Sequence, residues 1–284
     1  MNQIPKIKYS NQNHSTHLVE EEKVVYLKFP LFEKHGLIHG FSTRFGGVSE
    51  GDLSSMNLSF SRGDKEENVR ENYKRIGKAI GFDPKRLVFS DQIHKSTIHK
   101  VTKEDAGKGY ITEKLIGNDG LVTKEKEIPL VTFYADCVPL FFYDPIQQVI
   151  GMAHSGWRGT VERIGAKMIA MMEQEYGSKA NDILVVIAPS ICQNCYEVSE
   201  DVAEEFKREF KEFSSEEYLI DKNTGKYQLD LWRVNELLLL QSGIQKENLA
   251  VTDICTCCNK DLLFSHRASK GKRGNLAGFM MLKE

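Results

Sequence analysis

Two histidines and one cysteine in this sequence supply the side chains that a catalytic zinc ion would use. His94, Cys137 and His154 each interrupt or end an apolar segment that is predicted to form a strand. A side chain at the end of a strand is held by the sheet and can still reach a crevice. Two imidazoles and one thiolate form a borderline-soft donor set, and three protein ligands leave the fourth position of a tetrahedral zinc ion open.

The spacing of these three residues leaves other roles open. His94 and Cys137 are 43 residues apart and Cys137 and His154 are 17 apart, so no short motif joins them. Each histidine could be a hydrogen-bonded structural residue, and Cys137 could be a small core residue. A further alternative is a metal-free cysteine hydrolase or amidase, in which Cys137 is the nucleophile and His154 is its base. A measurement of metal content would distinguish a zinc site from these alternatives.

Four other cysteines form two pairs with metal-ligand spacing. Cys192 and Cys195 make one Cys-x-x-Cys pair, and Cys255 and Cys258 make another. Two such pairs are typical of a structural zinc site, although the 59 residues between them far exceed the usual spacing. The alternative is a set of ordinary buried or surface thiols. Six cysteines in 284 residues are sparse for a disulfide-rich extracellular scaffold.

Composition excludes several classes of function. The chain has 38 Lys and Arg against 40 Asp and Glu, a net charge of −2, so nothing favours nucleic acid or an acidic membrane as a partner. Its most apolar stretch, residues 128–143, is interrupted by Pro129, Asp136 and Pro139 and cannot span a bilayer. The first residues show no secretory signal. We therefore expect a cytoplasmic protein, and the sequence does not indicate its oligomeric state.

The pattern of apolar residues predicts an α+β fold in a single domain. After a loose segment over residues 1–22, one domain is expected over 23–284. Asp64 followed by Glu67 resembles a capping box at the start of an amphipathic helix. Helices are predicted over residues 64–81, 160–176, 199–210 and 230–242. Strands are predicted over residues 24–29, 37–42, 87–90, 130–135, 148–154, 183–188, 249–254 and 276–282.

Seven short motifs occur in an order that resembles one protein family. They are FSTRFGGVS (41–49), DQIH (91–94), NDGLVT (118–123), ADCVP (135–139), AHSGWRG (153–159), CYEV (195–198) and FSHR (264–267). This order is similar to that of the laccase-domain family, whose bacterial members were called polyphenol oxidases. The resemblance extends over about residues 24 to 282, nearly the whole chain.

The resemblance implies a fold, a metal and an activity. Members of the family bind one zinc ion through His, Cys and His, which correspond to His94, Cys137 and His154 in this sequence. They are described as purine nucleoside phosphorylases that act on adenosine, inosine and S-methyl-5'-thioadenosine and that also deaminate adenosine. The expected partners are therefore purine nucleosides and phosphate. The implied architecture has α/β/β/α layers with mixed sheets.

The older oxidase name can be tested against the residues. A multicopper oxidase binds about four copper ions and needs many histidines, often in His-x-His pairs. This chain has eight histidines and no such pair, so the number of ligands argues against an intrinsic laccase. Phenol oxidation by a copper-loaded protein remains an alternative, because Cu²⁺ can displace Zn²⁺ from such donors.

Three residues inside or near the matched motifs are candidates for substrate binding. Phosphorolysis needs phosphate to be oriented behind the ribose anomeric carbon, and a guanidinium group offers it a bidentate fork. We therefore expect Arg44 and Arg267 to anchor phosphate or substrate, with a structural ion pair as the alternative. Asn57 is a weaker candidate for a ribose or phosphate contact.

Each of three further polar residues has two alternative roles. Asp136 either orients a metal ligand or carries a proton. His266 is either an acid–base group or a hydrogen-bonded core residue. Arg158 contacts substrate or stabilises its own turn. The sequence does not decide among these roles.

Overall fold

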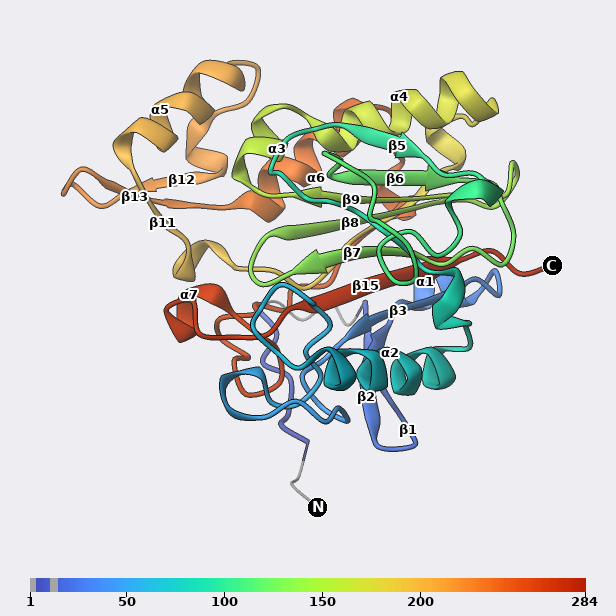
Figure 1. Cartoon of the computed structure of the whole chain (residues 1–284). Helices are drawn as coiled ribbons and strands as arrows, with labels where there is room; N and C mark the ends of the chain where they lie inside the picture. Colours follow the sequence, from blue (N-terminus) through green and yellow to red (C-terminus); the bar gives the residue numbers. More distant parts are fainter. Residues whose placement is uncertain (1–3, 11–14) are drawn as a thin grey trace.

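The fold is built on two large sheets that lie face to face. The computed structural model describes residues 4–10 and 15–284. The strands of the first sheet are β1 (His17–Glu21), β2 (Val24–Lys28), β3 (Ile38–Ser42), β4 (Val88–Phe89), β7 (Leu130–Tyr134) and β15 (Leu276–Met281). The order across this sheet is β1-β2-β3-β15-β7-β4, and only the β4–β7 pair is parallel. Figure 1 shows this sheet in the lower half of the molecule.

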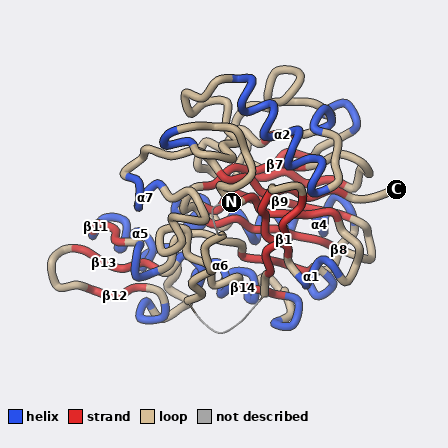
Figure 2. Tube along the Cα trace, turned by 90° about the horizontal axis from the view of Figure 1, so that it is seen from below, coloured by secondary structure: helices blue, strands red, loops and turns tan. Residues whose placement is uncertain are grey.

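The second sheet also has six strands and carries most of the candidate site. Its strands are β5 (Ile98–Lys100), β6 (Gly120–Thr123), β8 (Val138–Asp144), β9 (Val149–Ser155), β10 (Leu184–Ile187) and β14 (Leu249–Val251), in the order β14-β10-β8-β9-β6-β5. A small third sheet contains β11 (Glu197–Ser199), β13 (Lys226–Leu229) and β12 (Leu219–Asp221). This small sheet projects from one side of the molecule in both Figure 1 and Figure 2.

Helices cover the outer faces of the two large sheets. Helix α2 (Glu66–Ile80) packs on β2 and β3, whereas α4 (Ile164–Tyr176) and α6 (Leu231–Gln241) pack on the second sheet (Figure 1). The other helices are α1 (Pro30–Glu33), α3 (Trp157–Val161), α5 (Glu200–Glu209) and α7 (His266–Ser269). Short 3-10 turns are η1 (Gly51–Leu53), η2 (Pro84–Arg86), η3 (Lys103–Asp105), η4 (Ala180–Asp182), η5 (Gln193–Cys195), η6 (Ser215–Glu217) and η7 (Lys246–Asn248).

Successive side chains of a strand point to opposite faces of its sheet, and both faces are covered by apolar cores. In β15, Leu276 and Met280 belong to the apolar core between the sheets, while Ala277 and Phe279 belong to the core beneath α2. All seven residues of β8 are buried, because it is central in the second sheet and covered on both sides. The expected α+β fold in α/β/β/α layers is therefore confirmed.

The boundaries of several elements differ from those predicted. The helix predicted over 160–176 is split into α3 and α4, because Arg163 between them has a left-handed backbone with φ of 58°. Asp64 does not cap α2, whose N-cap residue is Lys65. The carboxylate of Asp64 instead accepts hydrogen bonds from Ser49 and Asn57 at 2.6 and 3.0 Å.

Seven strands were not predicted: β1, β5, β6, β8, β11, β12 and β13. Pro139 in β8 interrupts the apolar pattern, yet it fits the strand opposite His154. Residues 1–3 and 11–14 of the expected loose segment lie outside the described residues. Residues His17–Glu21 of that segment form β1 and pair with β2, so the sheet begins before residue 23. Within residues 4–10 and 15–284, no helix has both the length and the apolarity to cross a membrane.

A buried histidine between the sheets makes stability depend on pH. The side chain of His39 is fully buried, its Nε2 accepts a hydrogen bond from the Phe29 N–H at 2.9 Å, and its Nδ1 lies 3.0 Å from the Leu37 carbonyl oxygen. Burial lowers the pKa of His39 to about 4. The unfolded chain binds this proton below about pH 6.5, so stability is complete above that pH and decreases as the pH falls towards 4.

We expect the free energy of unfolding to lose about 2 kcal/mol through His39 between pH 8 and pH 5. Glutamine does not titrate. Between pH 8 and pH 5, the free energy of unfolding of His39→Gln should therefore fall by about 2 kcal/mol less than that of the wild type. Urea unfolding at the two pH values measures both slopes. Equal slopes would show that His39 does not carry this dependence.

Candidate metal centre and pocket

The three predicted metal ligands converge at one point of the structure. One ligand atom from each of His94, Cys137 and His154 lies within 4.8 Å of the other two. The two imidazole rings are 4.9 Å apart between centroids and nearly perpendicular, at 87°. His94 is exposed, Cys137 is half-buried and His154 is buried, so the cluster opens to solvent on the His94 side.

Strand pairing brings Cys137 to His154. In the antiparallel β8–β9 pair, Val138 lies opposite Ser155 and Pro139 lies opposite His154. Cys137 directly precedes β8 and therefore lies beside Gly156. A Cβ atom on Gly156 would lie 3.3 Å from the Cys137 sulfur and 3.4 Å from His94 Cδ2, tighter than most contacts. The missing side chain at this glycine thus leaves room for the three ligands to meet.

Asp119 connects the segments that carry the two histidines. Its carboxylate accepts a hydrogen bond from His154 Nδ1 at 2.8 Å and three more from the backbone N–H groups of Ile93, His94 and Lys95, at 2.9–3.1 Å. Burial alone would raise the pKa of Asp119, but the bond from His154 and those from the backbone lower it below its usual value. The carboxylate orients His154 so that Nε2 faces the cluster, as partners of metal-binding histidines do.

Asp119→Asn should weaken metal binding without removing a ligand. The amide cannot accept all four hydrogen bonds and has no charge, so we expect zinc affinity to fall by about 10–100-fold. Competition with a chelating dye measures this affinity. Asp91→Asn is the matched control, because Asp91 lies in the same loop region and accepts from the Gly117 N–H at 3.0 Å. Unchanged affinity in a folded Asp119→Asn protein would contradict the orienting role.

The protonation states of the cluster suit a metal ion. Burial raises the pKa of Cys137, but the neighbouring His154 and His94 outweigh this effect and lower it to about 6. Burial lowers the pKa of His154, but the Cys137 thiolate and Asp119 raise it to about 9. The cluster thus favours a thiolate beside an imidazolium, and a divalent cation would take the place of that proton. The donor set and the room at Gly156 fit a metal ion.

A pocket of about 320 Å³ lies next to the cluster. Four aromatic residues are part of its wall, and charged groups are provided by Asp91, Lys114 and Arg273. Its full lining is Ser59, Phe60, Ser61, Phe89, Ser90, Asp91, Gln92, His94, Gly109, Lys114, Phe133, Tyr134, Ala135, Cys137, His154, Arg273 and Asn275. Pockets of this size with aromatic walls and a few polar groups bind small organic molecules.

Arg273 is a polar residue of this pocket that the sequence analysis missed. Its Nε atom is buried and has no hydrogen-bond partner among the residues that the structure describes. Burial and the neighbouring Arg62 lower its pKa to about 10. Two neighbouring guanidinium groups and an unpartnered donor favour an anion. The signal in the sequence was a pair of cations between two glycines, Gly271-Lys272-Arg273-Gly274.

Arg44 lies outside this pocket. Its Nε donates to the Ser54 carbonyl at 2.8 Å and its Nη1 to the Lys260 carbonyl at 3.0 Å, and the guanidinium lies 4.8 Å from the centre of the Phe264 ring. It lines a neighbouring pocket, which also includes Arg273. In this structure Arg44 therefore connects two loops, and its role as a substrate anchor remains a prediction.

Asn57 and Arg267 also have structural contacts. Asn57 is fully buried; its amide nitrogen donates to Ser59 and Asp64, and its oxygen accepts from Ser59 and Asn275. The Arg267 guanidinium donates to the carbonyl oxygens of Cys195 and Glu197 at 3.2 and 3.0 Å. Neither residue lines the pocket beside the cluster, so their contact with substrate stays a prediction.

Hydrogen bonds to Asp136 stabilise the turn before Cys137. Asp136 has a φ of 94° and accepts a hydrogen bond from the Thr256 hydroxyl at 2.6 Å and another from the Arg267 N–H at 2.7 Å. It thus holds the turn that presents Cys137. His266 is exposed at the start of α7, and Arg158 lies 4.2 Å from the centre of the Trp157 ring.

Comparisons with known proteins agree with this architecture. Residues 38–283 match the family model described as multi-copper polyphenol oxidoreductase laccase. The chain is 39% identical over 251 residues to purine nucleoside phosphorylase YlmD of Bacillus subtilis, with 87% of this chain and 89% of that one covered. It is 34% identical over 263 residues to a purine nucleoside phosphorylase of Staphylococcus epidermidis, with coverage of 91% and 97%.

Solved structures show the same fold. The crystal structure of the hypothetical protein YfiH from Bacillus licheniformis aligns with a TM-score of 0.89 and 34% identity, covering 95% of this chain and all of that one. YlmD from Geobacillus stearothermophilus aligns with a TM-score of 0.87 and 33% identity, covering 94% and 99%. Similarity thus extends over nearly the whole length of both partners.

Proposed function

Because this chain belongs to the family described as multi-copper polyphenol oxidoreductase laccase, and relatives of similar length are named purine nucleoside phosphorylases, we propose that it is a zinc-dependent purine nucleoside phosphorylase. It converts adenosine, inosine and S-methyl-5'-thioadenosine, with phosphate, to the free base and the ribose 1-phosphate or its methylthio analogue. It also deaminates adenosine to inosine and ammonia. The reaction takes place in the cytoplasm.

The observation that supports this proposal is the convergence of His94, Cys137 and His154 at the wall of an aromatic pocket. Phe60, Phe89 and Phe133 line that pocket and offer apolar surface to a purine ring. The described histidines and cysteines form two clusters that could hold a metal, and neither resembles the many-histidine set of a multicopper oxidase. A zinc ion held by the three ligands would act as a Lewis acid and could activate water near neutral pH.

Phosphorolysis depends on positioning by the chain's own residues. A phosphate oxygen bonds to the ribose anomeric carbon while the bond from that carbon to the purine nitrogen breaks, and the electron pair leaves with the purine, which takes up a proton. Arg273 and Lys114 place positive charge in the pocket, where phosphate can be oriented for this attack. Lys114 also pairs with Asp91, which holds it at the rim. These contacts favour a nucleoside between the aromatic wall and the cationic side.

Chromatography of products from adenosine tests both activities at once. Protein with a measured zinc content is incubated with adenosine, with and without phosphate. Adenine that forms only with phosphate reports phosphorolysis. Inosine without phosphate, and inosine together with hypoxanthine in the presence of phosphate, report deamination. Release of neither product by the zinc-loaded protein would contradict the proposal.

A second candidate function rests on the same thiol. The lowered pKa of Cys137 and the raised pKa of His154 describe a thiolate–imidazolium pair in the absence of metal, which is the form of a cysteine nucleophile and its base. A cysteine hydrolase or amidase would stay active in the presence of a chelator and would be inactivated by alkylation. The zinc enzyme is expected to show the opposite behaviour, because metal-bound thiolate reacts poorly. Loading with Cu²⁺ and a phenol assay test the copper alternative.

A further inference from the structure

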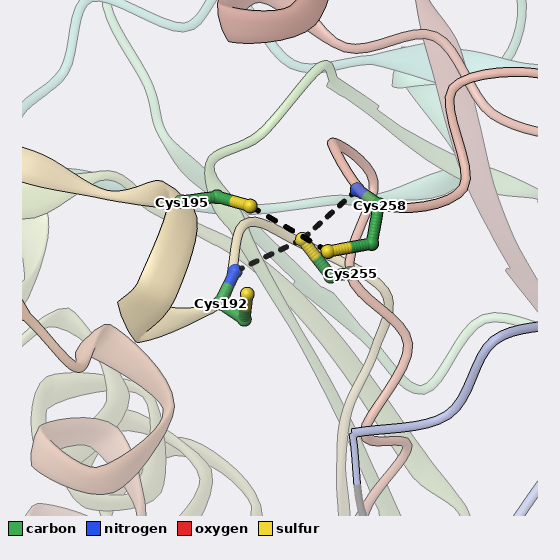
Figure 3. Close-up of side chains that lie close together, drawn as sticks. All are labelled: Cys192, Cys195, Cys255 and Cys258. Atoms are coloured by element: carbon green, nitrogen blue, oxygen red, sulfur yellow. Dashed lines mark hydrogen bonds between the residues drawn. The ribbon is translucent and has the colours of Figure 1, made fainter.

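Four cysteines away from the pocket form a second compact group. One sulfur atom from each of Cys192, Cys195, Cys255 and Cys258 lies within 4.8 Å of the other three. Cys192 and Cys255 are buried, Cys195 is half-buried and Cys258 is exposed. Figure 3 shows that the four side chains come from two separate segments and meet between them.

Parallel strand pairing explains why residues so far apart in sequence are neighbours. Strand β10 pairs in parallel with β14, with Ile187 opposite Val251. The pairing continues beyond both strands as an isolated parallel bridge between Ser190 and Cys255. Each segment then enters a turn that carries its Cys-x-x-Cys pair. The 59 intervening residues fold elsewhere, so the long spacing in sequence is no obstacle to a shared site.

The sulfur atom of Cys255 has the surroundings of a metal-bound thiolate. The backbone N–H groups of Cys192 and Cys258 both point at the sulfur of Cys255, at 3.3 and 3.4 Å (Figure 3). Such N–H donors stabilise negative charge on sulfur. Cys255 is completely buried, so its thiolate would otherwise lack compensation from solvent. A neutral thiol needs neither donor.

The geometry points to a second metal site, in which Cys192, Cys195, Cys255 and Cys258 bind one structural zinc ion. Four sulfurs at about 2.3 Å from a tetrahedral zinc ion lie about 3.8 Å from one another. The sulfurs of Cys195 and Cys258 are 3.5 Å apart, and none of the six distances exceeds 4.8 Å. A four-iron cluster, in which each cysteine binds a different iron, needs more space between the sulfurs. All four positions are filled by protein, so the site is closed and structural.

This zinc ion would join two segments that border the active site. Thr256, next to Cys255, donates to the Asp136 carboxylate, which holds the turn before Cys137. The Arg267 guanidinium donates to the Cys195 carbonyl oxygen, and its N–H donates to Asp136. The site therefore stabilises the η5 segment, the loop after β14 and the start of α7 relative to one another. We expect it to support the pocket without taking part in the chemistry.

Zinc stoichiometry of matched variants tests the proposal. Cys258→Ser removes an exposed ligand, and Cys257→Ser changes its neighbour, which is not one of the four. Elemental analysis should find one zinc ion fewer per chain in Cys258→Ser than in Cys257→Ser or the wild type. Thermal unfolding should shift down by about 5–10 °C in Cys258→Ser only. His94→Ala should still retain the tetrathiolate zinc, which separates this result from failure of the proposed function.

Native mass spectrometry provides a second measurement. The expected mass of the unmodified protein includes two zinc ions, one at each cluster, and one of them persists in His94→Ala. Substitution with Co²⁺ in that variant should give the intense absorption of tetrahedral thiolate coordination. Equal zinc content in Cys258→Ser and Cys257→Ser would overturn the proposal. Iron at this site, or a mass that is lower by the hydrogens lost to a disulfide, would also overturn it.

Discussion

Cys137→Ala is expected to abolish phosphorolysis and deamination together while the protein stays folded. The thiolate is one of three ligands, and the two remaining imidazoles cannot hold zinc against competition from solvent and buffer. We expect kcat/KM for both reactions to fall by roughly 1,000-fold or more, which corresponds to about 4 kcal/mol. Elemental analysis and the product assay measure the two losses. His94→Ala should give the same result, because it also leaves two ligands.

Comparing these two variants separates the candidate mechanisms. A cysteine hydrolase needs Cys137 and His154 as nucleophile and base, but it has no chemical need for His94. Loss of activity in Cys137→Ala with nearly full activity in His94→Ala would therefore favour the hydrolase. Full zinc and full turnover in either variant would refute the ligand assignment. Cys257→Ala serves as the control for cysteine replacement, because this residue does not line the pocket.

Arg273→Ala is expected to impair phosphorolysis far more than deamination. A charge-assisted hydrogen bond contributes about 1.5–3 kcal/mol, so kcat/KM for phosphate should fall about 10–100-fold, while inosine formation without phosphate changes less than about 5-fold. Arg273→Lys should recover part of the loss, since it keeps the charge but not the fork. Product chromatography over a range of phosphate concentrations measures both rates. Equal losses in the two reactions would indicate nucleoside binding or structural damage instead.

Stability provides an independent check on this variant. Arg273 lies near Arg62, whose charge lowers the pKa of Arg273, and its Nε has no hydrogen-bond partner among residues 4–10 and 15–284, so its replacement removes a repulsion between two cations. We therefore expect the melting temperature of Arg273→Ala to be unchanged or higher. Arg44→Ala and Arg267→Ala are useful comparisons, because the sequence predicts them as phosphate anchors. A selective loss of phosphorolysis in either variant would indicate that the replaced arginine binds phosphate.

The sequence alone determined the chemistry of the donors and the class of fold. A short run rich in β-branched, aromatic and other apolar residues depends only on near neighbours, so fully buried strands such as β9 and β15 could be predicted from it. The order of the seven motifs indicated the family and, through it, His94, Cys137 and His154. Pro139 concealed β8, because a proline inside a strand is tolerated only in particular pairings.

Only the tertiary structure decided which side chains meet. The β8–β9 register places Cys137 next to His154, and Asp119 reaches both histidine segments because β6 lies beside β9. Arg273 enters the pocket from a loop that carries no recognised motif. The side chains of Arg44 and Asn57 instead form hydrogen bonds with loop residues. The four outer cysteines meet because β10 and β14 pair in parallel. Such meetings depend on pairing between distant strands, and a pattern of neighbouring residues contains no information about that pairing.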